Sequence, residues 1–275
     1  MPTDPTDPTD PTAPATPEPY QTVRYEVAGG VATITLNRPD ALNGIINTMM
    51  REVHEVLREA AADDDVRVVV LTGAGKGFCP GADLKHYTTP GAVHEPLRRE
   101  YFHLTTLLHE MRPVTIAAVN GACAGAGFGW ACACDLRVAA ASANFSTAFL
   151  NVAVAGDMGG PWTLPRIVGP AKARELYFLP EKFGADEALR IGLVSRVWPD
   201  DEFRAEARAL ADRLAGAAPL ALQGMKAHFV AAEKLGFADF LDLETTDHER
   251  ITASEDCGEA FRAFVEKRPP QFKGR

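Results

Sequence analysis

The chain has 275 residues, of which 46% are hydrophobic, and 28 Lys and Arg against 37 Asp and Glu give a formal net charge of −9. This length suffices for one large domain or two small ones with a substantial buried core. The negative charge argues against a nucleic-acid partner and an anionic-membrane partner, because both require a positive protein field.

The first segment is low in complexity. The triplet Pro-Thr-Asp occurs three times between Pro2 and Asp10, and prolines continue to Pro19. So few apolar side chains cannot offset the entropy lost on ordering. Residues 1–19 are therefore predicted to form a disordered tail.

Short β-branched runs then alternate with helical periods. The helix predicted first, Asn47–Ala61, carries apolar residues at helical spacing, and a second precedes residue 114. Such alternation predicts an α/β fold with right-handed crossovers and a largely parallel sheet. The predicted strands are Val31–Leu36, Val66–Leu71, Val114–Val119 and Leu136–Ala139.

Beyond Pro161 the pattern becomes helical. Residues 20–200 are accordingly expected to form the core that holds the site, and residues 201–275 a helical region for oligomerisation or a lid. The predicted helices are Ala171–Phe178, Asp186–Gly192, Glu202–Leu214, Pro219–Leu235, Phe237–Ala253 and Cys257–Glu266.

Two glycine-rich segments, Thr72–Leu84 and Asn120–Gly129, follow the second and third predicted strands. Ligands of open α/β folds bind outside the carboxyl ends of strands, so both segments are candidate ligand loops. Neither matches a P-loop or a dinucleotide fingerprint. Each alone could be a close-packing turn, whereas two together would suit an oxyanion hole with one N–H donor from each loop.

These loops, with three further segments, resemble the signature regions of the crotonase (enoyl-CoA hydratase/isomerase) superfamily, and the resemblance extends from about Tyr20 to the C-terminus. It implies a crotonase-like spiral of ββα repeats, a homotrimer or hexamer, and an acyl-CoA thioester substrate. The segments are Asn37–Asn43, Gly77–Leu84, Ala118–Gly127, Cys134–Arg137 and Phe264–Pro269.

The resemblance also implies roles for individual residues. The backbone N–H groups of Ala82 and Ala126 correspond to the oxyanion donors. Coenzyme A enters as part of the substrate, with no separate cofactor and no metal. A solvated surface position is the alternative for Lys267, which lies three residues after Phe264 and thus on the same helix face. The implied coenzyme A contacts are Ala41, Leu42, Asp83, Leu84, Phe264 and Lys267.

The acid/base residues decide the reaction. Hydratases of this superfamily use two glutamates, at positions held here by Gly129 and Phe149, so two-glutamate hydration lacks both its groups. Asp157 remains in the same region, among small and apolar neighbours. Burial would raise its pKa and make it a better base near neutrality. The alternative is an Asp that caps a helix beginning near Gly160.

Three branches of the superfamily carry a catalytic aspartate at this position. The pattern from Ala148 to Arg166 is most similar to the epoxyphenylacetyl-CoA isomerases. The dienoyl-CoA isomerases also use acidic residues where Gly129 and Phe149 stand, and the 4-chlorobenzoyl-CoA dehalogenases a tryptophan where Phe149 stands. Both of these are therefore disfavoured.

The sequence thus predicts an enzyme that shifts a double bond in an enoyl-CoA, with Asp157 as the single acid/base. A hydratase for a specialised acyl-CoA and a catalytically silent CoA-binding subunit remain alternatives. The seven histidines show no metal-ligand spacing, and Cys79 is the cysteine to test for reactivity. Five cysteines without framework spacing, no apolar run of about 18 residues and no signal-peptide pattern predict a cytoplasmic protein without a membrane partner.

Overall fold

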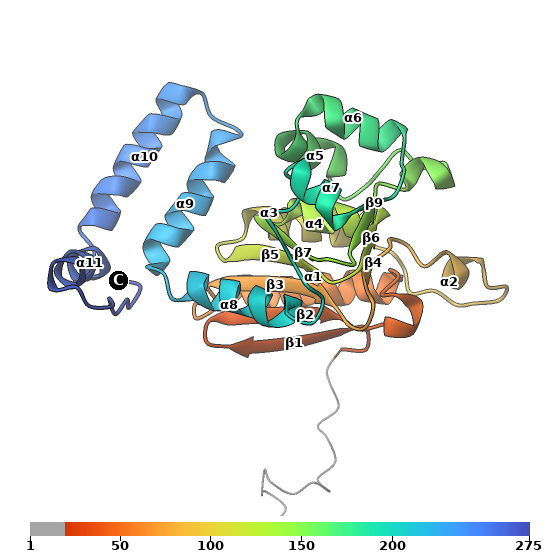
Figure 1. Ribbon diagram of the computed structural model, residues 1–275, viewed down its shortest axis with the longest axis horizontal. Helices are drawn as coiled ribbons and strands as arrows, with labels where there is room; N and C mark the ends of the chain where they lie inside the picture. Colours follow the sequence, from red (N-terminus) through yellow and green to blue (C-terminus); the bar gives the residue numbers. More distant parts are fainter. Residues whose placement is uncertain (1–19) are drawn as a thin grey trace, which may run out of the picture.

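The computed structural model describes residues 20–275, and the predicted tail of residues 1–19 lies outside them. Two sheets and a set of surrounding helices make up the fold (Figure 1). The larger sheet has six strands in the order β1-β2-β3-β5-β7-β10. These strands are β1 (Val23–Ala28), β2 (Val31–Leu36), β3 (Val68–Gly73), β5 (Val114–Val119), β7 (Leu136–Ala140) and β10 (Arg196–Trp198).

All pairs in this sheet are parallel except the β1–β2 hairpin. Gly29 and Gly30 make the turn of that hairpin, and both adopt positive φ, which glycine tolerates without a steric penalty. The predicted alternation of strands and helices is therefore confirmed. Two edge strands were not predicted: antiparallel β1 and, at the other edge, β10, which lies in the region expected to be helical.

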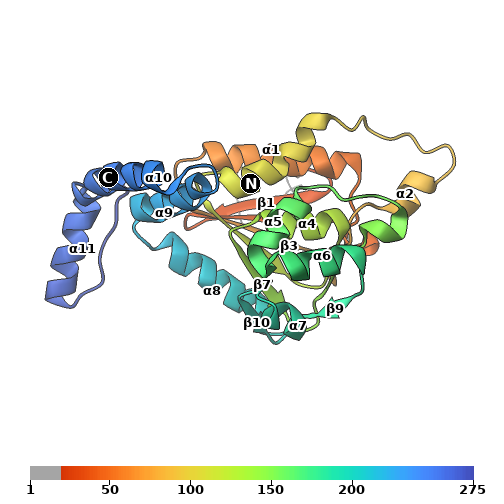
Figure 2. The same ribbon diagram turned by 90° about the horizontal axis from the view of Figure 1, so that it is seen from above.

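The sheet is covered on both faces. Val69 and Leu71 of β3 point into the main core, whereas Val68 and Val70 point to the opposite face, as the two-residue period of a strand requires. The main core is closed by α1 (Asn47–Ala62), α3 (Leu104–Glu110) and α4 (Gly125–Ala133), and the opposite face by α8 (Phe203–Ala215). Figure 2 shows the large sheet between α1 on one side and α8 on the other.

A smaller sheet has the strand order β4-β6-β8-β9. Its members are two or three residues long, too short for a hydrophobic period to reveal them in the sequence. Helices α5 (Gly160–Val168), α6 (Pro170–Phe178) and α7 (Ala185–Arg190) gather beside it (Figure 1). The strands are β4 (Gly77–Cys79), β6 (Ala122–Ala124), β8 (Asn144–Ser146) and β9 (Phe183–Gly184).

Short helical segments connect these parts. The 3-10 helices are η1 (Pro39–Ala41), η2 (Arg99–His103) and η3 (Phe149–Val152), and α2 (Leu84–Thr88) is a helix of one turn. In Figure 2, α2 and the chain that follows it project at one end of the molecule. This end also carries the two glycine-rich segments.

The chain ends in α9 (Pro219–Ala232), α10 (Phe237–Thr252) and α11 (Glu255–Glu266). These helices extend away from the sheets, at the end opposite α2 (Figures 1 and 2). The ends of all six predicted C-terminal helices agree with the structure to within three residues. Helix α8 packs on the large sheet, whereas α9 to α11 form the projecting part; the predicted division of the chain at residue 200 stays a prediction.

Candidate active site

The two glycine-rich segments meet at Gly81 and Gly125. Both have positive φ, of 95° and 51°. A Cβ placed on Gly81 would lie 3.5 Å from the backbone nitrogen of Ala126 and 3.3 Å from the carbonyl oxygen of Ala124. Glycine is therefore required at residue 81 both for its dihedral angle and for this close approach. The consequence is that the loop before Ala82 lies directly against the first turn of α4.

The backbone N–H groups of Ala82 and Ala126 are both available to a ligand. Ala126 is the second residue of α4, and the first N–H groups of a helix have no acceptor within the helix. Within residues 20–275, neither N–H donates to an oxygen of another residue. Ala82 is exposed and Ala126 buried, so the pair lies where solvent meets the core. Two converging N–H donors at a helix N-terminus can stabilise an oxyanion.

Packing of backbone on backbone makes this arrangement stiff. A Cβ on Gly127 would overlap the carbonyl oxygen of Cys79 and lie 2.6 Å from the Cys79 Cβ. A Cβ on Gly121 would likewise overlap the carbonyl oxygen of Lys76. The parallel pairing of β4 with β6 holds the same two segments together. The N–H donors are thus preorganised by structure that leaves no room for a side chain.

The segment around Ala41 and Leu42 joins the first loop through one ion pair. The Arg38 guanidinium lies 2.8 Å from the Asp83 carboxylate, and it also donates to the carbonyl oxygen of Gly44. Asp83 accepts a further hydrogen bond of 3.0 Å from the His86 N–H and so caps α2. Partial burial opposes ionisation of Asp83, but these hydrogen bonds lower its pKa. The Arg38–Asp83 pair was not predicted from the sequence.

Four of the predicted coenzyme A contacts therefore lie together. A bridge between Ile45 and Ala82 completes the link, with Ile45 donating to Gly81 and Asp83 donating to Ile45. The side chains of Leu42 and Leu84 are exposed beside it, which leaves them free to contact a ligand. The four residues are Ala41, Leu42, Asp83 and Leu84.

Asp157 lies in a tight turn between η3 and α5. Gly156, Met158 and Gly159 all have positive φ, and for Met158 this left-handed conformation is strained. Asp157 Oδ1 is buried and has no hydrogen-bond partner within residues 20–275. Burial raises the pKa of Asp157 from 3.8 to about 6. The rise in the pKa of Asp157 that the sequence predicts is therefore present in the structure.

The alternative, in which Asp157 caps a helix, is wrong. Gly159 is the N-cap of α5, and no side chain caps that helix. Only the backbone carbonyl of Asp157 contributes, accepting a 3.2 Å hydrogen bond from the Gly160 N–H. The carboxyl group is therefore free of any capping role. A partly buried carboxyl with a raised pKa is a candidate general base.

The turn that contains Asp157 packs against α4 about one helical turn from Ala126. A Cβ on Gly129 would lie 2.6 Å from the Met158 Cβ and 3.6 Å from the Asp157 carbonyl oxygen. Because Gly129 and Ala126 are three residues apart on α4, they share one face of the helix, about 4.5 Å apart along its axis. The structure thus brings Ala82, Ala126 and Asp157 to one region.

The two positions where hydratases of the superfamily carry glutamates are filled differently. Residue 129 has no space for a side chain, because the Met158 Cβ lies against the helix there. Phe149 is buried, and its ring stacks on the Tyr177 ring with centroids 6.0 Å apart and planes 8° apart. Tyr177 on α6 was not singled out in the sequence, where it is one residue of an ordinary helical period.

Phe264 and Lys267 do not join this region within one chain. Helix α11 lies at the far end of the molecule from α2 and α4 (Figure 1). The prediction that both residues share one helix face is wrong, because α11 ends at Glu266 and Lys267 is its left-handed C-cap, with φ of 53°. Phe264 is 86% exposed.

Cys79 is not a reactive cysteine. Its side chain is fully buried, and burial raises its pKa to about 12. A thiol of this pKa is protonated at neutral pH and is a poor nucleophile. Its position against Gly127 shows instead that it packs the two loops together.

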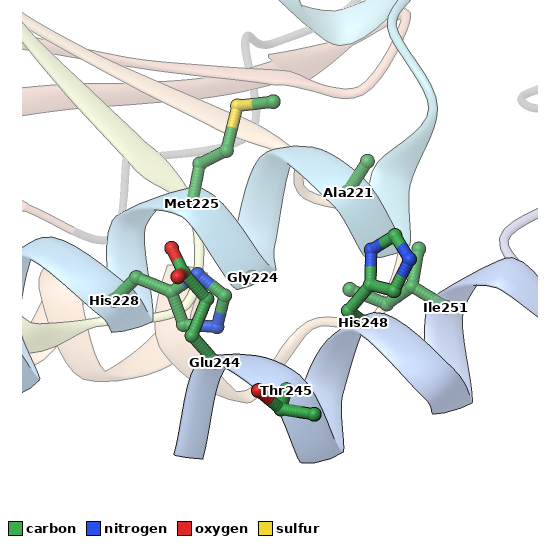
Figure 3. A pocket seen from close by; sticks show the side chains of 8 residues that line it. All are labelled: Ala221, Gly224, Met225, His228, Glu244, Thr245, His248 and Ile251. Carbon is green, nitrogen blue, oxygen red and sulfur yellow. The ribbon is translucent and has the colours of Figure 1, made fainter. Parts of the chain in front are cut away.

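A separate pocket of about 380 Å³ lies between α9 and α10 and is lined by residues of both helices (Figure 3). It contains His228 and His248, but His228 already pairs with Asp247 at 3.1 Å. In the part of the chain that the structure describes, no three His, Cys, Asp or Glu side chains are grouped to hold a metal. Nor does any described helix combine the length and apolar character needed to cross a bilayer.

Several known proteins are similar to this chain in sequence and in structure. The profile of the enoyl-CoA hydratase/isomerase family matches residues 26–275. A protein named probable enoyl-CoA hydratase from Rhodobacter capsulatus is 40% identical over 257 residues, covering 93% of this chain and 99% of its own. The 1,2-epoxyphenylacetyl-CoA isomerase of Escherichia coli is 37% identical, covering 90% and 97%. The crystal structure of an enoyl-CoA hydratase from Bacillus anthracis superposes with a TM-score of 0.85 at 31% identity, covering 93% and 100%.

Proposed function

The chain belongs to the enoyl-CoA hydratase/isomerase family of acyl-CoA-processing proteins, the crotonase superfamily, and on this premise we propose that it is an enoyl-CoA isomerase. The observation that carries the proposal is Asp157. Its carboxyl is partly buried, its Oδ1 atom is fully buried and has no partner within residues 20–275, and burial raises its pKa to about 6.

In the proposed reaction, the thioester oxygen accepts hydrogen bonds from the Ala82 and Ala126 N–H groups. These donors stabilise the enolate that forms when a proton leaves the acyl chain, and removal of one such donor typically costs a factor of about 10²–10³ in rate. Asp157 takes the proton from one carbon and returns it to another, which shifts the double bond. One carboxyl suffices for this transfer because it acts first as base and then as acid.

Binding of the substrate is proposed to use the joined segments Ala41–Leu42 and Asp83–Leu84 for coenzyme A. The exposed side chains of Leu42 and Leu84 lie beside the Ala82 donor. In a chain with net charge −9, backbone N–H groups can bind phosphates without an overall positive field. No separate cofactor is needed for a proton transfer of this kind.

We further propose that the protein assembles as a trimer or as a hexamer of two trimers. Phe229, Phe237, Phe261 and Phe264 on α9 to α11 are each at least 68% exposed, which is unusual for large aromatic side chains. Since α11 lies far from α4 within one chain, Phe264 and Lys267 would contact coenzyme A bound to a neighbouring copy. Light scattering of the purified protein measures the assembly directly.

The proposed reaction is tested with Asp157→Asn. Conversion of 3-enoyl-CoA to 2-enoyl-CoA is followed by the absorbance of the conjugated product, and we expect the rate to fall by a factor of about 10²–10⁴. Asp212→Asn, which changes an exposed carboxylate on α8, is the matched control and should keep the full rate. Unchanged turnover in Asp157→Asn would refute the assignment.

A hydratase is the second candidate, favoured by the name of the Rhodobacter capsulatus relative. The replacement of both glutamate positions by Gly129 and Phe149 opposes two-glutamate hydration, so Asp157 alone would have to assist water. Incubation with 2-enoyl-CoA separates the two functions, because hydration removes the conjugated absorbance and isomerisation to a 3-enoyl-CoA leaves no hydroxyl product. Mass spectrometry identifies the product by the added 18 Da of one water.

A further inference from the structure

The side chain of Tyr177 contacts the Asp157 turn at both of its ends. A Cβ on Gly156 would lie 3.3 Å from Tyr177 Cε1, and a Cβ on Gly160 would overlap the Tyr177 hydroxyl. The ring edge therefore contacts the chain before Asp157, and the hydroxyl contacts the chain after it. Glycine at both positions permits this approach.

The ring of Tyr177 is held in place from its other side. Phe149 stacks on it with nearly parallel planes, as described above. Phe149 is itself buried. The position of the hydroxyl is thus set by packing and not by a hydrogen bond.

Two buried polar atoms, one in the Asp157 turn and one in the side chain that packs against this turn, lack partners. The Tyr177 hydroxyl and Asp157 Oδ1 are both buried, and within residues 20–275 neither makes a hydrogen bond, to the other or to a third residue. A buried polar group without a partner is destabilising, so native structures rarely keep one without a reason. A polar group of a ligand, placed between them, would satisfy both.

The chemistry of the two atoms defines that group. A tyrosine hydroxyl donates one hydrogen bond, and an ionised carboxylate can only accept. We propose that Tyr177 and Asp157 together bind a single ligand oxygen that carries a hydrogen, accepting from Tyr177 and donating to Asp157. This oxygen belongs to a hydroxyl of the acyl chain or to a water molecule that enters with the substrate.

This inference rests on the proposed function, because it places the ligand oxygen beside the carbon at which Asp157 acts. The inference also extends the proposed function, because an unsubstituted acyl chain would leave both polar atoms without partners. The site then prefers acyl groups that carry a hydroxyl, or it holds a water molecule at the position of that hydroxyl. Tyr177 is then a residue that determines substrate specificity.

The test uses Tyr177→Phe, which removes the hydroxyl and keeps the ring that stacks on Phe149. Tyr25→Phe is the matched control, because the Tyr25 hydroxyl in β1 is likewise buried and has no partner within residues 20–275. Affinities are measured calorimetrically for butyryl-CoA, 3-hydroxybutyryl-CoA and 4-hydroxybutyryl-CoA. Hydration of 2-butenoyl-CoA, in which water adds its oxygen to C3 and a proton to C2, is measured in parallel.

If the oxygen belongs to the acyl chain, the unmodified protein binds one hydroxylated probe about tenfold more tightly than butyryl-CoA. Tyr177→Phe loses this preference and keeps its affinity for butyryl-CoA. If the oxygen belongs to water, Tyr177→Phe instead slows hydration at least tenfold with the same butyryl-CoA affinity. Tyr25→Phe behaves like the unmodified protein in both cases.

The inference is overturned if Tyr177→Phe matches the unmodified protein in both measurements, or if the unmodified protein shows neither preference nor hydration. A loss shared by Tyr25→Phe also overturns it, because the effect would then come from stability. Failure of the proposed function is distinguishable, because the unmodified protein would then bind these acyl-CoA probes without converting 3-enoyl-CoA to 2-enoyl-CoA.

Discussion

At the end of the molecule that holds α2, α4 and α5, backbone packs on backbone, whereas at the other end α9, α10 and α11 expose large aromatic side chains to solvent. In the first region, residues 121 and 127 have no space even for a methyl group. In the second, Phe264 is 86% exposed. The first region is tightly packed within one chain, whereas the second exposes apolar surface of the kind that oligomer interfaces bury.

One buried ion pair attaches the second region to the first. The Lys226 ammonium on α9 lies 2.7 Å from Asp135 and donates to the carbonyl oxygens of Leu108 and Pro113. Burial lowers the pKa of Lys226, and the neighbouring Asp135 carboxylate opposes that change. The comparison therefore predicts that substitutions at the packed end and at this attachment destabilise the chain, whereas substitutions on the exposed helices alter assembly.

The largest effect on stability is expected at the attachment. Lys226→Met leaves the Asp135 carboxylate without its counter-ion and should lower the free energy of unfolding by about 3–5 kcal/mol. Urea denaturation measures this change. The pair Lys226→Met with Asp135→Asn should recover part of the loss. If the Lys226→Met variant unfolds at the same urea concentration as the unmodified protein, the ion pair does not attach the helices as described.

The packed end is tested by Gly127→Ala. The added Cβ meets Cys79, so we expect a loss of about 3 kcal/mol, at the upper end of overpacking costs, and a lower turnover as the oxyanion loops separate. Gly184→Ala is the matched control, because a Cβ there has no neighbour within 4 Å and its φ is −88°. That control should stay within about 0.5 kcal/mol of the unmodified protein. Equal stabilities of the two variants would refute the close packing.

Asp157→Asn should stabilise the fold while it removes activity. The pKa of Asp157 is raised from 3.8 to about 6, so ionisation between these pH values costs stability in the folded state. Removing the carboxylate should therefore raise the free energy of unfolding by about 1–3 kcal/mol at pH 7.5, and the gain should vanish near pH 4. Melting temperatures at both pH values measure it, and a gain at pH 4 would argue against a buried charge.

The same pKa sets the pH dependence of the reaction. A general base must be ionised in the free enzyme, so kcat/KM should rise with pH and level off above about 6. The measurement is isomerase activity between pH 4.5 and 8, at constant ionic strength. A profile that falls over this range would show that Asp157 first acts as an acid.

The smallest effect on the folded chain is expected at the exposed end. Phe264→Ser should change the stability of a single chain by less than about 0.5 kcal/mol and weaken assembly. Val93→Ser is the control, because Val93 is 95% exposed but lies outside α9 to α11. Light scattering measures the assembled mass of both variants. A similar loss of assembly in both would refute the interface on these helices.

Much of the fold was predictable because its signals are local. The period of Asn47–Ala62 and the β-branched runs of β2, β3 and β5 identify the large sheet and its first helix. The strands β4, β6 and β8 were not predictable, because three residues carry no usable period and exist as strands only through pairing with one another.

For the site, the amino-acid sequence identified the chemical groups, namely two glycine-rich loops and a single aspartate where glutamates are absent, and the resemblance to a family related these groups to one another. The folded chain was needed to show that Asp157 Oδ1 is buried and caps no helix, that Lys267 lies beyond the end of α11, and that Tyr177 lies against the Asp157 turn. The reason is physical. A residue's chemistry is local, but desolvation and unsatisfied hydrogen bonds depend on neighbours that are distant in the sequence.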